Sequence, residues 1–463
     1  MNIRHLLTLA ALAASLAAQA QGGISPEMLA RIKNAQPKAA PAEKALRNAL
    51  AANSINALAV NPARAQATDT HFSHRVCSKG VTDQKSSGRC WLFTGLNVLR
   101  AEAIARHDLG EFQFSQAYCF FYDQLEKSNL FLQSVIDLAD RPMDDKTVDW
   151  LFHNPLSDGG TFCGVQDIVS RYGLVPAEVM PETYSANNTA KMSDLLQQKL
   201  RQWGLELRDM AAAKASKKNV AARKEEMLAT VYRILALCLG EPPAEFTWTR
   251  TNADGEPQET KTYTPRSFYD EMAGKNLNDY VMLMNDPTRP YYKTYAIDLD
   301  RHAYDGHNWT FLNLPMDEIK QMAIASIKDS TMMYMSCDVG KCYNRETGLL
   351  AVDNYDYADL FDTDFPMTKA QRIATFASAS SHAMTMMAVD LDENGTPRKW
   401  MVENSWGPSA GYKGHLIMTD RWLDEYLFRL VVERRFVPEN ILKLTEQKPT
   451  LLPAWDPLFA GEN

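Results

Sequence analysis

A cysteine directly precedes an apolar helical pattern in residues 84–93, which read Gln-Lys-Ser-Ser-Gly-Arg-Cys-Trp-Leu-Phe. The run from Trp91 to Ala103 predicts a helix that has Leu92, Leu96 and Leu99 on one face. Cys90 would then lie at the helix N-terminus, where unsatisfied N–H groups and the helix dipole stabilise a thiolate. Arg89 beside it would add positive charge. We therefore expect a reactive thiol; the alternative is a buried structural cysteine.

A thiolate nucleophile needs a general base and a group that orients this base. Two predicted strands, residues 381–390 and 399–407, flank a turn that contains an Asn-Gly pair. Paired positions in such a hairpin have a constant sum, here 786 to 789, so His382 faces a position between 404 and 407. Asn404 lies in this window and could accept a hydrogen bond from the imidazole, while Trp406 would shield that bond from water.

The first twenty residues have the pattern of a secretory signal peptide. A short basic region precedes an apolar run from Leu6 to Ala17, and Ala18-Gln-Ala20 is a cleavage signal before Gln21. We expect an exported protein, either periplasmic or secreted, and the alternative is an uncleaved membrane anchor. No later apolar run is long enough to span a bilayer.

Composition narrows the classes of partner and cofactor. The net charge of -8 argues against a nucleic-acid partner. Seven cysteines among 463 residues do not make a disulfide-rich scaffold, and no pairing can be read from them. Cys337 and Cys342 have a C-x4-C spacing, which is a weak metal signal without further ligands nearby. We therefore predict no metal and no cofactor.

The rest of the chain alternates between helical and strand patterns. Residues 21–70 predict a leader with short helices at Met28–Asn34 and Ala42–Ala52. A helical block follows at 187–240, in which the charged stretch 214–226 is a link or an exposed face and Met227–Leu239 is a second helix. Beyond it we expect a hairpin at 246–264, strands at 280–284, 291–297 and 331–337, and a helix at 316–329.

Several long motifs resemble the papain-like cysteine proteases, and in particular their bleomycin hydrolase and aminopeptidase C branch (peptidase family C1B). The matching segments are Thr82 to Phe93, Asp158-Gly-Gly160, His382-Ala-Met-Thr385, Val402-Glu-Asn-Ser-Trp-Gly407 and Leu452-Pro-Ala-Trp-Asp-Pro457. The interval of 292 residues from Cys90 to His382 exceeds the about 130–150 of simple papain-type enzymes. The surplus can house the helical block and the hairpin after it.

The resemblance implies an α+β fold with two lobes, an inserted subdomain and a C-terminal arm. After the signal peptide (1–20) and the leader (21–70), residues 71–186 would form the helical lobe with Cys90. Residues 187–275 would be the inserted helical and hairpin subdomain. Residues 276–445 would form a β-rich, barrel-like lobe with His382 and Asn404, and residues 446–463 the arm in the active-site cleft.

The resemblance also implies roles for single residues. Cys90 is the nucleophile, His382 the base and then the acid, and Asn404 the group that orients the imidazole. Gln84 supplies an oxyanion-hole amide together with the backbone N–H of Cys90. Peptide hydrolysis would pass through a thioester. The implied substrate-binding residues are Asp158, Gly159, Gly160, Trp406 and Asn463.

The C-terminal arm is where the chain departs from the branch it resembles. In that branch the terminal carboxylate meets the substrate's amino group and limits cleavage to the N-terminal end. Here the tail is longer and more polar, ending in Gly461-Glu-Asn463. We expect a cysteine aminopeptidase acting on peptides; the alternatives are an endopeptidase and a non-catalytic peptide-binding protein. The branch also implies a homohexamer.

Overall fold

The computed structural model describes residues 22–36, 40–274 and 276–458. The predicted signal peptide and the end of the C-terminal arm, with Glu462 and Asn463, lie outside the described residues. The chain divides into two units, residues 1–60 and 61–463. In the first, the structure has helices α2 (Pro26–Asn34), α3 (Pro41–Ala52) and α4 (Ile55–Ala59), of which the first two are the predicted ones.

A mixed sheet of twelve strands organises the described part of the second unit, in the order β14-β5-β6-β4-β13-β7-β10-β11-β12-β9-β8, with β1 also paired to β10. The strands are β1 (His74–Arg75), β4 (Tyr280–Met284), β5 (Lys293–Ile297), β6 (Thr310–Asn313), β7 (Met333–Cys337), β8 (Tyr343–Asn344), β9 (Leu349–Leu350), β10 (His382–Leu391), β11 (Pro397–Glu403), β12 (His415–Thr419), β13 (Leu427–Glu433) and β14 (Thr450–Leu452). Nearly every residue of β7, β10 and β13 is buried, so these strands read as continuous apolar runs.

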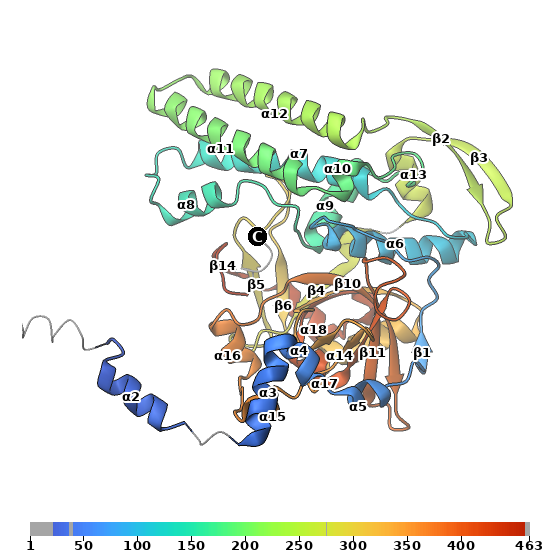
Figure 1. The fold of residues 1–463 in the computed structure, drawn as a ribbon. Helices are drawn as coiled ribbons and strands as arrows, with labels where there is room; N and C mark the ends of the chain where they lie inside the picture. Colours follow the sequence, from blue (N-terminus) through green and yellow to red (C-terminus); the bar gives the residue numbers. More distant parts are fainter. Residues whose placement is uncertain (1–21, 37–39, 275, 459–463) are drawn as a thin grey trace, which may run out of the picture. The chain divides into compact units, whose positions relative to one another are not determined.

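Helices fill most of the chain from residue 90 to residue 272. They are α6 (Cys90–His107), α7 (Gln116–Asp137), α8 (Lys146–His153), α9 (Phe162–Tyr172), α10 (Tyr184–Asn187), α11 (Ala190–Ala212), α12 (Lys217–Leu239) and α13 (Pro265–Met272). Figure 1 shows α7, α11 and α12 side by side. The predicted hairpin follows as β2 (Phe246–Thr251) and β3 (Pro257–Tyr263). The predicted domain boundaries inside 61–463 stay predictions.

Short helices connect the strands of the sheet and lead to the arm. They are α5 (Pro62–Gln66), η1 (Leu277–Asp279), α14 (Met316–Lys328), α15 (Tyr357–Phe361), α16 (Lys369–Ala374), α17 (Asp420–Tyr426), η2 (Arg434–Phe436), α18 (Glu439–Leu442) and η3 (Lys443–Glu446). Among the described residues, no helix is both long and apolar enough to cross a membrane.

Two details of the helices differ from the sequence-based expectation. Helix α6 is buried on every side from residue 91 to residue 101 rather than on one face, because it lies between α7 and α9 and strand β10 (Figure 1). Helix α12 begins at Lys217 instead of Met227, since the Ser216 hydroxyl accepts a hydrogen bond from the backbone of Asn219 and caps it there. Most of the charged stretch 214–226 is therefore the exposed face of a helix.

Candidate active site

Cys90 is the first residue of α6, so its backbone lies where the helix leaves N–H groups unsatisfied. The neighbouring Arg89 side chain pairs with a carboxylate rather than with the Cys90 thiol. Its guanidinium is fully buried and forms two hydrogen bonds to the Glu182 carboxylate, at 3.0 and 2.7 Å. The expectation that Arg89 adds positive charge to the thiol is therefore wrong. The Glu182 carboxylate largely cancels the electrostatic potential that the guanidinium would produce at Cys90.

His382 begins strand β10, and Asn404 follows the last residue of β11. Nε2 of His382 lies 2.8 Å from Oδ1 of Asn404, and this oxygen also accepts the Ser405 N–H at 2.8 Å. Because Oδ1 is an acceptor, Nε2 carries the proton and Nδ1 keeps its lone pair for a substrate or thiol proton.

The hairpin register explains how this contact forms. Thr385 pairs with Glu403, and a bulge shifts the register between Met386 and Ala388. Continued past its last pair, the ladder would place position 406 opposite His382, so Asn404 reaches the imidazole diagonally. Trp406 stacks on the His382 ring, with centroids 4.8 Å apart and planes 29° apart. It thus covers the imidazole; the structure does not place it in the cavity described below.

Burial lowers the pKa of His382 to about 4, while the hydrogen bond to Asn404 acts in the opposite direction. The imidazole is therefore neutral at pH 7 and able to accept a proton. We expect kcat/KM to stay level at mildly acidic pH and to fall as the pH drops through about 4, because a protonated imidazole no longer serves as a base. A pH profile of kcat/KM checks this, and an acidic limb centred near pH 6.5 would contradict it.

Gln84 is held rigidly by the neighbouring chain. Its Oε1 accepts the Ser405 hydroxyl at 2.6 Å, its Nε2 donates to the Ser87 carbonyl at 2.6 Å, and its own N–H donates to the Ser405 carbonyl at 2.8 Å. An amide nitrogen has two hydrogens. The second N–H of Nε2 has no hydrogen-bond partner among the described residues.

One cavity of about 320 Å³ is lined by Gln84, Cys90 and His382 together. Its other lining residues include Gly88 and Ser157 to Gly160 from the helical part, and Tyr334, Ser336, Ser381 and Ala383 from the sheet. Sequence reasoning missed Tyr334 and Ser336, because the pairing of β7 with β10 joins positions far apart in the chain. It also missed Ser405, although this residue directly follows Asn404 in the motif.

Among the predicted substrate-binding residues, Asp158, Gly159 and Gly160 line this cavity. They differ in whether their hydrogen-bonding groups are already paired within the protein. The Asp158 carboxylate is used within the protein, where Thr189 and Ser193 donate to it. The N–H of Gly159 donates to the Ser157 hydroxyl, and its carbonyl accepts the Lys127 ammonium.

Gly160 is the residue of this segment whose backbone groups are unpaired. Its N–H and C=O have no hydrogen-bond partner among the described residues. A Cβ at this position would lie 2.2 Å from Cε1 of His302 and 2.9 Å from Cδ2 of Trp91, so only glycine fits. The predicted Asn463 lies outside the described residues.

Neither disulfides nor a metal centre are found among the described residues. The seven cysteines, all of them described, form no disulfide. No cluster of three or more histidine, cysteine or acidic residues could hold a metal ion in this part of the chain. Cys337 is buried in β7, directly opposite His382 in the ladder.

A cysteine at a helix start, a neutral imidazole fixed by an asparagine and an amide donor in one cavity define a cysteine peptidase site of the papain type. A family model described as "Peptidase C1-like family" matches residues 24–459. The chain belongs to this family.

Individual relatives agree with this assignment. The chain is 40% identical over 401 residues to human bleomycin hydrolase, covering 84% of this chain and 88% of the relative. It is 38% identical over 397 residues to aminopeptidase C of Lactobacillus delbrueckii subsp. lactis, covering 85% and 88%. The crystal structure of PepW from Lactobacillus rhamnosis HN001 superposes with a TM-score of 0.90 at 38% identity, covering 94% of this chain and 98% of that one.

The predicted branch, the α+β papain-like fold and the enzyme class, a cysteine-type aminopeptidase, are confirmed by these relatives.

Proposed function

We propose that this protein removes N-terminal residues from peptides through a thioester acyl-enzyme. The observation that carries the proposal is the single cavity of about 320 Å³ that Gln84, Cys90 and His382 line, with His382 fixed by Asn404 at 2.8 Å. These side chains come from both halves of the second unit, yet they face one space of a size that suits a peptide.

The first half of the reaction follows from these positions. His382 accepts the Cys90 proton as the sulfur attacks the scissile carbonyl, and the carbonyl oxygen becomes an oxyanion. Nε2 of Gln84 and the Cys90 N–H donate to this oxygen. When the tetrahedral intermediate collapses, His382 gives its proton to the leaving amine, which departs and leaves a Cys90 thioester.

The second half regenerates the enzyme. Water enters where the amine left, His382 takes a proton from it, and the hydroxide attacks the thioester carbonyl. The thiolate leaves and recovers a proton from His382, while the N-terminal residue is released as an acid. Asn404 keeps Nε2 protonated in both halves, so that Nδ1 exchanges every proton.

The described part of the C-terminal arm supports cleavage at the N-terminal end of a peptide. Strand β14 pairs in parallel with β5, and Asp456 forms an ion pair with Arg289 at 2.5 Å. Ala454 lies in a cavity that shares Gly159 and Gly160 with the catalytic one. We propose that the terminal carboxylate of Asn463 meets the substrate's amino group, as the family resemblance implies.

A pair of substrates tests the proposal. Wild type should hydrolyse an alanine amide of 7-amino-4-methylcoumarin that has a free amino group, and should leave the N-acetylated form intact. Deleting residues 461–463 should allow cleavage of the acetylated form. Equal cleavage of both forms by wild type would overturn the aminopeptidase and favour an endopeptidase, and cleavage of neither would favour a peptide-binding protein.

Removal of the Gln84 side chain should lower kcat by about 10²–10³-fold, as the loss of one oxyanion donor does in such sites. KM should change little, because the donor acts on the transition state rather than on the bound substrate. Steady-state kinetics of Gln84→Ala checks this. A large rise in KM with an unchanged kcat would mean that Gln84 binds the substrate instead.

We further propose that the protein is exported, with residues 1–20 as a cleaved signal peptide, and that it forms a homohexamer. The basic and apolar pattern before Gln21 supports export; only the family resemblance supports the hexamer. N-terminal sequencing of the mature protein should begin at Gln21, and light scattering should give six times the chain mass. An intact N-terminus or a monomer would contradict the respective proposal.

A further inference from the structure

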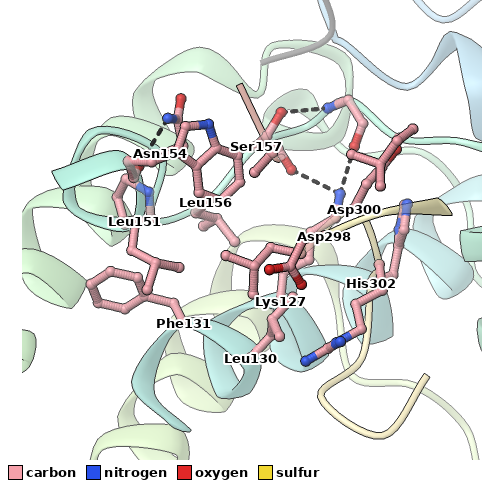
Figure 2. Close-up of a pocket in the computed structure, with 18 residues that line it drawn as sticks. Lys127, Leu130, Phe131, Leu151, Asn154, Leu156, Ser157, Asp298, Asp300 and His302 are labelled. Carbon is pink, nitrogen blue, oxygen red and sulfur yellow. Dashed lines mark hydrogen bonds between the residues drawn. The ribbon is translucent and has the colours of Figure 1, made fainter. Parts of the chain in front are cut away.

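A second cavity, of about 90 Å³, adjoins the catalytic cavity, and Ser157, Gly159 and Gly160 line both. Much of its wall is apolar and comes from α7, α8 and the segment after β5. Figure 2 shows Phe131, Leu151 and Leu156 on one side of this pocket and Asp298, Asp300 and His302 on the other. An apolar pocket with carboxylates at one side, next to the peptide-binding glycines, has the form of a specificity subsite.

The basic residues that line this pocket are held by the protein itself. Lys127 pairs with the buried Asp123 at 2.9 Å and donates to the carbonyls of Ser157 and Gly159 at 3.0 and 2.6 Å. His302 binds the same Asp123 through Nδ1 at 2.5 Å, and its Nε2 accepts the Thr161 N–H at 3.3 Å.

Arg301, the remaining base, donates to the side-chain oxygen of Asn308 at 3.1 Å. All three basic side chains of the lining thus have partners other than the two pocket carboxylates.

The acidic residues differ from the basic ones. The Oδ2 atom of Asp300 is buried and accepts no hydrogen bond from the described residues. Burial raises the pKa of Asp300, and the charges of Arg429 and Lys127 act in the opposite direction. The Asp298 carboxylate likewise has no ion-pair partner in the described chain, although its backbone N–H donates to Leu452. A buried carboxylate oxygen without a donor is costly, so this site favours a ligand that brings one.

We propose that this pocket is a subsite for an ammonium group of the peptide substrate, with Asp300 as its main acceptor and Asp298 as a second one. This rests on the proposed function, because the pocket receives a peptide only if the adjoining cavity binds one. The ammonium has two sources: the side chain of a lysine, or the α-amino group of the N-terminal residue if Asn463 does not hold that group. In either case Asp300 is a specificity-determining residue and takes no part in the chemistry of the bond.

Binding to the inactive Cys90→Ala protein without residues 461–463, which should admit acetylated peptides, tests the subsite without turnover. Isothermal titration compares three dipeptide amides: norleucyl-alanine amide, which has only an α-ammonium; N-acetyl-lysyl-alanine amide, which has only a side-chain ammonium; and N-acetyl-norleucyl-alanine amide, which has neither. Adding Asp300→Asn should weaken binding of one ammonium peptide by about 10–100-fold, as expected for a hydrogen bond to a charged group. The uncharged peptide should bind as before.

The pattern of loss identifies the source of the ammonium. Weakening of norleucyl-alanine amide alone assigns the pocket to the α-amino group, and weakening of the acetyl-lysyl peptide alone assigns it to the lysine side chain. Asp364→Asn, which removes an exposed carboxylate, is the matched control for net charge. If Asp300→Asn binds all three peptides like its parent, the subsite is disproved.

Cleavage assays separate this proposal from the proposed function. If Cys90-dependent hydrolysis occurs and Asp300→Asn leaves the preference for ammonium substrates unchanged, the subsite fails while the function stands. If binding of an ammonium peptide depends on Asp300 but the Cys90 protein cleaves none of the corresponding substrates, the function fails and the subsite stands.

Discussion

Replacing Cys90 by alanine should abolish hydrolysis, with a loss in kcat on the order of 10⁴-fold or more, as when the nucleophile of a covalent mechanism is removed. The reason is that neither His382 nor Gln84 can form the acyl intermediate. Both residues assist the formation of the bond between sulfur and the substrate carbonyl carbon, and only the Cys90 thiolate can form this bond. The measurement is hydrolysis of the free-amino alanine substrate, with both proteins prepared in parallel.

Cys77→Ala is the matched control, because Cys77 is an exposed thiol outside the cavity and its loss should leave activity unchanged. A covalent readout strengthens the test. Quenching wild type during turnover should leave a mass increase, equal to the acyl group, on the peptide that contains Cys90. Hydrolysis that survives in Cys90→Ala would disprove the mechanism, regardless of the similarity to known cysteine peptidases.

Replacing Arg100 by methionine should destabilise the protein by about 3–5 kcal/mol, the usual cost of leaving one partner of a buried ion pair without the other. Arg100 lies on α6, the helix that begins with Cys90, and pairs with Glu403, the residue before Asn404. At most 1% of either side chain is exposed. Ser78 accepts from Arg100 at 3.2 Å and donates to Glu403 at 3.0 Å.

The same ion pair links helix α6, which carries Cys90, to the end of strand β11, which Asn404 follows. Arg100→Met should therefore lower kcat as well as the midpoint of urea unfolding. The double variant Arg100→Met with Glu403→Met should regain most of the lost stability, since no charge is then left buried. If the double variant is as unstable as the single one, lost packing rather than the stranded carboxylate explains the effect.

Local patterns predicted the helix after Cys90 and the hairpin that carries His382 well. The contact between His382 and Asn404 belongs to one hairpin, whose turn and strand lengths can be read directly from the sequence. The helix after Cys90 was likewise visible in its apolar run. In both cases the interacting residues are close in the chain, so the geometry of one strand pair or one helix decides their placement.

Contacts between distant segments could not be predicted in this way. Nothing near Arg89 in the sequence indicates that Glu182 neutralises it, and nothing near Asp158 indicates that Thr189 and Ser193 occupy its carboxylate. The periodicity of apolar residues did not predict the burial of α6 on several sides, for a similar reason. A helix covered on several sides shows no single apolar face, and only its neighbours reveal that.

By itself the sequence predicted that Cys90 starts a helix and that Asn404 contacts His382, because the spacing rules of a helix and a hairpin place these residues. The family motifs then supplied the enzyme class. Only the tertiary structure decided which charges are already paired and that the backbone groups of Gly160 are unpaired. It also decided that Asp300 lines the adjoining pocket with a buried oxygen that accepts no hydrogen bond from the described residues. Burial and charge pairing depend on chain segments that meet only after folding, and no local pattern records them.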